Sequence, residues 1–387
     1  MRLAVLDPLN RPGLETGPRS IAAVKVLRLS ITDRCNFRCV YCMPADGMTW
    51  LAQDHILTYE EIRDVVRAAV ELHGIRRFKL TGGEPTVRRG LVDLVGMLRN
   101  VRGVEDLSLT TNGQRLIDLA HPLRQAGLDR VTISVDSLDP EKFRRITRTG
   151  DLATVLRGIE ACDDAGFTST KINCVTMRGT NDDELTDFAR LTIARDVTVR
   201  FIEYMPLGDA ALMTPRATTA NGEQHARNTG FQPVPDALVD RAELGPAAGC
   251  GAQERGADSL IPESEVRAII EAQLGPLDPV DRNTEAGVGP ANVYRLRHHS
   301  PRGRVGFISA MSQPFCDTCN RLRLTADGTL RSCLFEGGEV DVRSILRSTL
   351  NDPDRSSTLA RAMTECVRLK PDVHSKYGNA PMSRIGG

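Results

Sequence analysis

The sequence predicts an α/β fold in which six parallel strands alternate with crossover helices, followed by a smaller C-terminal α+β region. Three observations lead to this fold class. Short apolar, β-rich runs alternate with segments of helical periodicity, several of these runs end in polar or glycine-rich turns, and the alternation stops after Pro206. Such alternation is typical of a parallel sheet covered by helices. A doubly wound sheet and a barrel both fit it.

The strands are predicted from runs rich in apolar and β-branched residues, at 26–32, 78–81, 107–111, 131–135, 171–176 and 199–205. Between them, apolar residues recur three and four positions apart, as they do on one face of a helix. The first helix is predicted to start at Thr58, because Thr58-Tyr59-Glu60-Glu61 has the pattern of a capping box. Further helices are indicated by the apolar faces at 91–98, 152–159 and 185–191.

Three of the predicted strands end in turns that suit a ligand site. These turns are Thr81-Gly82-Gly83-Glu84-Pro85, Thr110-Thr111-Asn112-Gly113 and Ser134-Val135-Asp136-Ser137. Ligands of parallel α/β sheets gather at the carboxyl ends of the strands. We therefore expect one site ringed by these strand ends.

Four parts are predicted along the chain: a loose arm at 1–20, the alternating region at 21–213, an insertion of low order at 214–260, and an extension at 261–387. The insertion is rich in Ala, Gly, Thr, Pro and Gln and shows little periodicity. In the extension we expect a helix at 266–270, strands at 293–296 and 305–308, and two closing helices. Asp327-Gly328 predicts a β-hairpin before those helices.

Charge and composition exclude several classes of function. The 50 basic residues balance the 50 acidic ones, so no bulk charge draws the chain to nucleic acid or to a membrane. No apolar run approaches the roughly 18 residues of a membrane span, and the N-terminal run is too short for a signal peptide. We expect a cytoplasmic protein.

Six of the 10 cysteines fall into two groups, and in a reducing compartment grouped cysteines indicate metal ligands. The first group, Cys35, Cys39 and Cys42, has the spacing C-x3-C-x2-C directly after the first predicted strand. Three thiolates around a [4Fe–4S] cube leave one iron without a protein ligand, and an open position usually serves chemistry. A structural zinc knuckle is the alternative, although zinc pairs usually come as C-x2–4-C with a second distant pair.

The second group, Cys316, Cys319 and Cys333, again supplies three thiols. On spacing alone, a zinc ribbon lacking one ligand competes with an iron–sulfur cluster. Arg321 and Arg323 follow and alternate with leucines, so on a strand both would point to one face. Guanidinium groups suit bidentate binding of phosphate oxygens, whereas the alternative is a solvated edge strand.

Basic residues also interrupt the apolar strand runs, at Arg28, Lys79 and Lys171. An unpaired charge inside such a run is costly to bury. We therefore expect an anionic partner for them, either a ligand or a neighbouring carboxylate.

Several of these motifs resemble those of a known family. The C-x3-C-x2-C loop, with Tyr41 before its last cysteine, and the Gly82-Gly83-Glu84-Pro85 turn resemble the radical S-adenosylmethionine superfamily. Longer stretches are similar to its GTP 3',8-cyclase family of molybdenum cofactor biosynthesis. These stretches lie at 30–44, 80–86, 110–113, 201–208 and 315–325, together with the Gly386-Gly387 tail. The resemblance covers nearly all of 20–387 except the insertion.

The resemblance implies an incomplete (β/α)6 TIM-type barrel with a C-terminal α+β extension that carries a second iron–sulfur cluster. The first cysteine group would hold one [4Fe–4S] cluster, whose open iron binds S-adenosylmethionine. The second group would hold another [4Fe–4S] cluster, whose open iron binds the guanine of GTP.

The resemblance also assigns residues to both small molecules. S-adenosylmethionine would contact Tyr41, Gly83, Ser134 and Met205, with the glycine leaving room for the ligand. GTP would contact Arg28, Lys79, Thr110, Lys171, Arg321, Leu322 and Arg323. The family commonly has Arg at the position of Lys79, so the charge is kept while bidentate geometry is lost. The catalytic residues would be Arg321, Arg323, Gly386 and Gly387, the last two reaching into the site from the C-terminus.

The implied reaction is that of a radical lyase. A 5'-deoxyadenosyl radical removes the ribose 3' hydrogen of GTP, and the resulting carbon radical attacks C8. A reduction and a proton transfer then complete 3',8-cyclo-7,8-dihydro-GTP, with the second cluster or a nearby arginine as candidate donors. The reaction needs an external electron donor, and its product would pass to a separate cyclic pyranopterin monophosphate synthase. The family is commonly homodimeric.

Two other functions fit parts of the pattern. A radical enzyme that modifies peptides would have a peptide-docking domain before the barrel, and about 25 residues precede the first strand. An iron–sulfur redox sensor would not require the Gly-Gly-Glu-Pro turn or the basic residues inside strands.

Overall fold

The structure, a computed structural model, describes residues 17–207, 259–281, 289–336, 338–375, 378 and 382–385. Within these ranges the strands form one 12-stranded sheet, in the order β12-β11-β10-β1-β2-β3-β4-β5-β6-β9-β8-β7. The arm up to residue 16, nearly all of the 214–260 insertion, and the Gly386-Gly387 tail lie outside the described residues.

The middle of this sheet is the predicted set of six strands. They are β1 (Val26–Ser30), β2 (Arg77–Thr81), β3 (Asp106–Thr111), β4 (Arg130–Ser134), β5 (Thr170–Thr176) and β6 (Val197–Glu203). Each pairs in parallel with the next strand along the chain. This sequential order is that of a partial barrel, because a doubly wound sheet reverses its strand order at a switch point. The predicted fold class is therefore confirmed.

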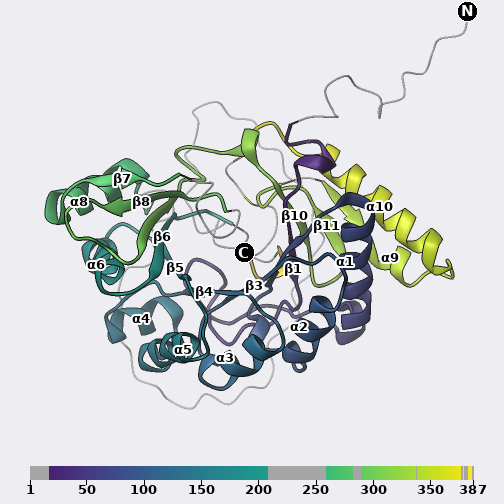
Figure 1. The fold of residues 1–387 in the computed structure, drawn as a ribbon, viewed down its shortest axis with the longest axis horizontal. Coiled ribbons are helices and arrows are strands. Elements are labelled where there is room, and N and C mark those ends of the chain that lie inside the picture. Colours follow the sequence, from purple (N-terminus) through teal and green to yellow (C-terminus); the bar gives the residue numbers. More distant parts are fainter. Residues whose placement is uncertain are drawn as a thin grey trace, which may run out of the picture.

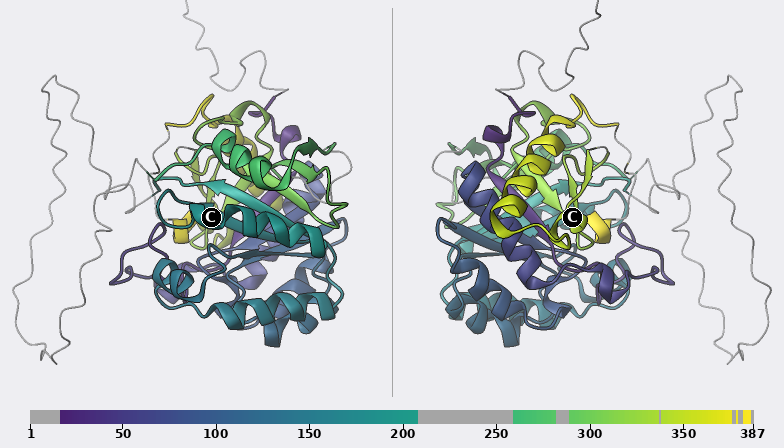
Figure 2. Two further views of the ribbon diagram at one scale, coloured as in Figure 1. Left: turned by 90° about the vertical axis from the view of Figure 1, so that its left-hand side faces the viewer. Right: turned by 90° about the vertical axis from the view of Figure 1, so that its right-hand side faces the viewer.

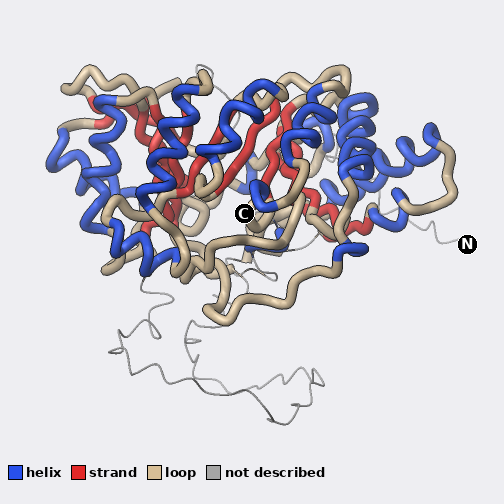
Figure 3. Tube along the Cα trace, turned by 90° about the horizontal axis from the view of Figure 1, so that it is seen from below, coloured by secondary structure: helices blue, strands red, loops and turns tan. Residues whose placement is uncertain are grey.

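Helices connect these strands and lie outside the ring that the strands form (Figure 1). They are α1 (Tyr59–His73), α2 (Leu91–Arg99), α3 (Leu116–Gln125), α4 (Pro140–Thr147), α5 (Leu152–Asp164) and α6 (Leu185–Ala194). In Figure 3 the strands run side by side, with helices along them. The apolar periodicity predicts α1, α2, α5 and α6. The structure adds α3, which contains Pro122, and α4, which spans only eight residues.

The start of α1 shows how the sequence sets an element's boundary. Thr58 accepts a hydrogen bond from the Glu61 backbone N–H at 3.1 Å, and the Glu61 carboxylate accepts one from the Thr58 N–H at 2.7 Å. This is the predicted capping box, which satisfies backbone donors that have no partner inside the helix. Gly74, with φ of 65°, ends the helix in the left-handed conformation that suits glycine.

Segments from the C-terminal extension lengthen both edges of the six-stranded ring. Beside β1 lies β10 (Arg321–Leu324), paired in parallel, and then the antiparallel strands β11 (Thr329–Arg331) and β12 (Glu339–Asp341). Beside β6 lies β9 (Arg304–Ile308), also parallel, followed by β8 (Asn292–Leu296) and β7 (Leu277–Pro279). Figure 2 shows these green and yellow segments packed against the purple to teal barrel.

The extension contains the predicted elements and a few more. The predicted hairpin joins β10 to β11, with Gly328 at φ of 82° in its turn. The helices are α8 (Glu263–Leu274), α9 (Arg343–Leu346), α10 (Asp352–Arg368) and the short α11 (Met382–Ile385), one more closing helix than expected. No helix among the described residues is long and apolar enough to cross a membrane.

The hydrophobic core lies between the strands and the outer helices. On β1, Leu27 and Leu29 are completely buried in this core, whereas Arg28 between them faces the inside of the ring. On β5, Ile172 and Cys174 are in the core in the same way. Because successive side chains of a strand point to opposite faces, the outer face is apolar and the inner face is free for polar residues.

Candidate active site

The inner face of the ring encloses a cavity of about 330 Å³, a size suited to a small-molecule site. Alternate residues of β1 to β6 and of β10 line it. All six grouped cysteines line the same cavity: Cys35, Cys39, Cys42, Cys316, Cys319 and Cys333. The structure thus brings together two groups that lie more than 270 residues apart in the sequence. The expectation of a single site at the strand ends fits this arrangement.

The first cysteine loop is fixed on one side by the Gly82-Gly83 turn. The Gly83 N–H donates to the Thr32 carbonyl oxygen at 2.7 Å, and the Glu84 N–H donates to that of Arg34 at 2.8 Å. A Cβ on Gly83 would lie 2.4 Å from the carbonyl oxygens of Asp33 and Arg34. Glycine is therefore needed for the close approach of two backbone segments, in addition to its place in the cavity lining.

The buried Glu84 carboxylate ties the same turn to the end of β3. Its two oxygens accept hydrogen bonds from the Thr86 N–H, the Thr111 hydroxyl at 2.7 Å and the Asn112 N–H at 2.6 Å. Asn112 in turn donates to the Asn36 side chain inside the cysteine loop at 2.8 Å. Turns that follow β1, β2 and β3 are thereby joined in one hydrogen-bonded unit.

On its other side the cysteine loop is held by the end of α4. Backbone hydrogen bonds of 2.9 Å join Arg38 to Thr147 and Val40 to Ile146. Arg148, which has a positive φ of 62°, donates from its guanidinium group to the carbonyl oxygens of Arg38 and Met43 at 2.9 and 3.0 Å. A non-glycine residue with positive φ is uncommon, and here it accompanies two hydrogen bonds to the loop. Sequence reasoning missed this residue.

The spacing of the first group of thiols suits a metal cluster, whereas their pKa values report burial. Burial raises the pKa of Cys35 to about 12 and raises that of Cys39 as well. It raises the pKa values of Cys162 and Cys366, which lie outside both groups, to about 12 in the same way. In the described part of the chain, no three His, Cys, Asp or Glu side chains converge as the ligands of a single metal ion do. A [4Fe–4S] cube binds each thiolate at a different iron.

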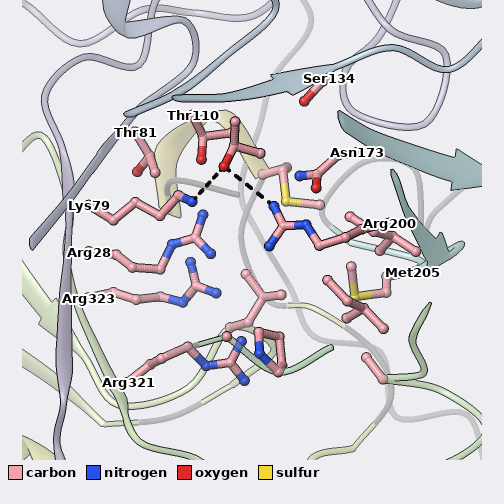
Figure 4. A pocket seen from close by; sticks show the side chains of 18 of the residues that line it. Arg28, Lys79, Thr81, Thr110, Ser134, Asn173, Arg200, Met205, Arg321 and Arg323 are labelled. Carbon is pink, nitrogen blue, oxygen red and sulfur yellow. Dashed lines mark hydrogen bonds between the residues drawn. The ribbon is translucent and has the colours of Figure 1, made fainter. Parts of the chain in front are cut away.

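Tyr41 links this loop to the end of β4. Its hydroxyl donates to the Asp136 carboxylate at 2.7 Å, and the Val175 N–H donates to the other oxygen at 2.9 Å. Burial raises the pKa of Asp136 to about 6. Ser134 and Met205, the other residues expected to contact S-adenosylmethionine, also line the cavity (Figure 4).

A row of cations forms one wall of the cavity. Strand register places Arg323 of β10 beside Arg28 of β1, and Arg28 beside Lys79 of β2. Figure 4 shows these side chains and Arg321 stacked on one side, with Arg200 of β6 reaching in from the other. The Lys79 ammonium donates to the Thr132 hydroxyl at 3.1 Å, and Arg200 approaches the same oxygen at 3.5 Å.

Burial and mutual repulsion shift the pKa values of this row downward. Burial, together with neighbouring arginines, lowers the pKa of Arg28 and that of Lys79. The pKa of Arg323 falls to about 9 and that of Arg200 to about 10, in both cases mainly through burial. Like charges gathered in this way suit a ligand that carries negative charge. Carboxylates also line the cavity, at Glu84, Asp106 and Asp136.

Most residues expected at the site from the sequence line this cavity, including Thr110 and Lys171. Leu322 differs, since it is completely buried in the core between the two arginines of β10 and does not line the cavity. Arg200 was missed, although it interrupts an apolar strand run just as Arg28 does. Gly386 and Gly387 lie outside the described residues, but Met382 of α11, just before them, lines the cavity.

Comparison with known proteins identifies the family to which the chain belongs. The family model for the radical SAM superfamily matches residues 29–192, and that for molybdenum cofactor synthesis C matches residues 243–376. A GTP 3',8-cyclase from Pelotomaculum thermopropionicum is 41% identical over 368 residues, which cover 94% of this chain and 98% of that protein. The chain belongs to the GTP 3',8-cyclase family.

The chain is also similar to a second GTP 3',8-cyclase and, more weakly, to solved structures of other proteins. A GTP 3',8-cyclase from Pseudomonas putida is 41% identical over 351 residues, covering 91% of this chain and 90% of that protein. Among solved structures, Streptococcus suis SuiB bound to its precursor peptide SuiA has a TM-score of 0.41 at 16% identity, covering 48% of this chain and 41% of that chain. Escherichia coli coproporphyrinogen III oxidase (HemN), titled a radical SAM enzyme, has a TM-score of 0.35 at 19% identity, covering 48% and 46%. The family resemblance predicted from the motifs is confirmed.

Proposed function

We propose that this chain is a GTP 3',8-cyclase, which uses S-adenosylmethionine to convert GTP to 3',8-cyclo-7,8-dihydro-GTP in the first step of molybdenum cofactor biosynthesis. Membership of the family supports this function. The observation that carries it is that one cavity is lined by both cysteine groups and by a row of cations. Of these cations, Arg200 and Arg323 are buried, and Arg28, Lys79, Lys171 and Arg321 are half-buried. A site for generating a radical and a site for a polyphosphate would then share one cavity.

Cys35, Cys39 and Cys42 would hold the first [4Fe–4S] cluster, and the hydrogen-bonded turns on both sides of their loop fix its position. When bound, this cluster supplies the electron that cleaves S-adenosylmethionine to methionine and a 5'-deoxyadenosyl radical. Tyr41, Gly83, Ser134 and Met205 would bind and orient S-adenosylmethionine, as all four line the cavity. Tyr41 itself is held by Asp136.

GTP would bind on the opposite part of the lining. Its triphosphate would neutralise the cations contributed by several strands, which are Arg28, Lys79, Lys171, Arg200, Arg321 and Arg323, with a further contact from Thr110. Arginine suits this task because its planar group binds phosphate oxygens in pairs. Leu322 would contribute through its backbone. Cys316, Cys319 and Cys333 would hold a second [4Fe–4S] cluster beside the guanine.

Radical chemistry needs a site that keeps competing reactants out. β10 and β9 extend both edges of the partial barrel, and segments of the extension line the cavity with Ile308, Ala310 and Phe335. Gly386 and Gly387 would follow α11 into this space and position the substrate. Arg321 and Arg323 would then act both in binding and in catalysis.

The enzyme would act as a cytoplasmic lyase and homodimer, receive electrons from an external donor, and deliver its product to a cyclic pyranopterin monophosphate synthase. Removal of the ribose 3' hydrogen and bond formation at C8 define the product that this synthase would accept.

The test is anaerobic incubation of the reconstituted protein with S-adenosylmethionine, GTP and a strong reductant. We expect 5'-deoxyadenosine and the cyclised nucleotide to form together, with eight irons per chain. Cys35→Ala should abolish cleavage of S-adenosylmethionine. Formation of 5'-deoxyadenosine that does not depend on GTP would refute the cyclase.

A further inference from the structure

Lys370, just after the last turn of α10, is a buried cation beside the second cysteine group. Only 4% of the residue is exposed, and its ammonium donates to the carbonyl oxygen of Cys319 at 2.9 Å. A buried ammonium is costly unless an anion lies close to it. An anionic group is therefore expected near the Lys370 ammonium.

Among the described residues, Lys370 forms no ion pair with a carboxylate. The nearest acid in the sequence, Asp372, is engaged elsewhere, because its carboxylate pairs with Arg19 at 2.7 Å and is 86% exposed. Arg19 also donates to the Lys370 carbonyl oxygen at 2.8 Å, which fixes the backbone around the lysine. Its ammonium is bound instead at the backbone of a residue of the second cysteine group.

The two cysteine groups differ in the charges around them. Beside the first group lie the carboxylates of Glu84 and Asp136, which line the same cavity. Beside the second group, Arg321 approaches the Cys319 sulfur at 3.9 Å and the Lys370 ammonium donates to the Cys319 carbonyl oxygen at 2.9 Å.

We propose that Lys370 is the counter-charge of the second cysteine group, a positioning residue that holds the loop at Cys319 and makes the cluster bound there easier to reduce. This inference rests on the proposed second [4Fe–4S] cluster. Reduction adds a negative charge to a cluster, and a buried cation next to its ligands stabilises that charge. Hydrogen bonds and burial around the ligands are known determinants of cluster potential.

The test uses the full-length, reconstituted protein with Lys370→Gln and Lys370→Arg. Glutamine removes the charge and keeps an N–H donor, whereas arginine keeps the charge. Lys25→Gln is the matched control, because Lys25 is exposed and also donates to a carbonyl oxygen, that of Ala22, at 2.9 Å. The readouts are irons per chain and the redox titration of each cluster followed by electron paramagnetic resonance, with the first cluster as internal reference.

We expect Lys370→Gln to lower the reduced-to-oxidised ratio of the second cluster about tenfold at a fixed potential, equivalent to about 59 mV for a one-electron couple. Lys370→Arg, Lys25→Gln and the first cluster should keep wild-type values. Loss of four irons in Lys370→Gln with retention in Lys370→Arg would support the same role.

Two results would overturn the inference: an unchanged second-cluster potential in Lys370→Gln, or loss of the second cluster from both Lys370 variants, which would assign the residue to packing. The proposed function fails differently. If the wild-type protein holds eight irons but forms no 5'-deoxyadenosine that depends on GTP, the proposed cyclase activity is wrong. The cluster potentials of the wild type and the Lys370 variants can still be compared in that case. Wild-type protein with four irons overturns both.

Discussion

At Gly83 one additional carbon atom would collide with two backbone carbonyl oxygens, each 2.4 Å away. Backbone atoms cannot move aside as the end of a flexible side chain does, so the cysteine loop and the turn after β2 would have to separate. The loop that holds Cys35 starts at this contact. The effect of a substitution should therefore fall on cluster binding.

We expect Gly83→Ala to lose the irons of the first cluster and the cleavage of S-adenosylmethionine while keeping the second cluster. Iron analysis and 5'-deoxyadenosine formation measure this. Gly96→Ala in α2 is the control, because its Cβ would meet nothing within 4 Å and alanine favours a helix. Retention of eight irons and normal cleavage in Gly83→Ala would contradict the argument.

Arg200 permits a sharp test of the cationic wall. It is buried on β6 with its guanidinium group inside the cavity, and its pKa is lowered to about 10, so it is still charged at neutral pH. Hydrogen bonds to charged groups contribute about 1.5–3 kcal/mol. We expect Arg200→Met to weaken GTP binding by about 10- to 100-fold, as measured by calorimetry.

The matched control for that substitution is Arg190→Met on α6, where the side chain is 53% exposed and pairs with Asp187. It should leave GTP affinity unchanged. Equal affinities for the Arg200 variant and the wild type would place the triphosphate elsewhere in the cavity.

At the scale of elements, α11 leads directly to the C-terminal tail. Met382 of this helix lines the cavity and Ile385 is buried, so the helix is anchored at the site. Deleting Gly386-Gly387 should preserve both clusters and the binding of S-adenosylmethionine, and should suppress cyclisation by at least tenfold. Product analysis by liquid chromatography measures this effect, and normal turnover would show that the tail has no role.

The elements differ in how far the sequence predicts them. The first six strands and the capped α1 follow from local patterns, because apolar alternation and a capping box act over a few residues. The pairing of β10 with β1 joins segments nearly 300 residues apart and has no local signal. The family resemblance indicated an extension with a second cluster but not this pairing.

The residues of the candidate site also differ in how far the sequence predicts them. The cysteines and the basic residues Arg28, Lys79 and Lys171 could be identified from spacing and from charge inside apolar runs. Arg148 could not, since its role depends on a positive φ and on hydrogen bonds to a loop 105 and 110 residues away. Lys370 was missed for a similar reason, because only the folded chain shows that it is buried and forms no ion pair with a carboxylate of the described residues.

For the molecule as a whole, the row of cations in the cavity makes stability dependent on anionic ligands. A ligand that binds only the folded state stabilises it by about 2.7 kcal/mol at a concentration of 100 times its Kd. We therefore expect GTP, and inorganic tripolyphosphate to a smaller extent, to raise the melting temperature by several degrees.

Calorimetric or fluorescence melting curves measure this shift, with the increase falling as salt is added. Lys79→Met should reduce the increase, because it removes one of the cations that the ligand would neutralise. An equal shift with a nonionic nucleoside such as guanosine would indicate that charge is not the source of the stabilisation.

The parallel pairing of β10 with β1 also has a consequence for the order of events during synthesis. The loop with Cys35 and all six barrel strands have been made by residue 203, whereas β10 begins at Arg321. A chain made by the ribosome at about 5–20 residues per second folds its N-terminal part first. For several seconds, then, the nascent protein contains the residues that would generate a radical but lacks the strand that would hold its target. Loading the first cluster only after release would protect the growing chain.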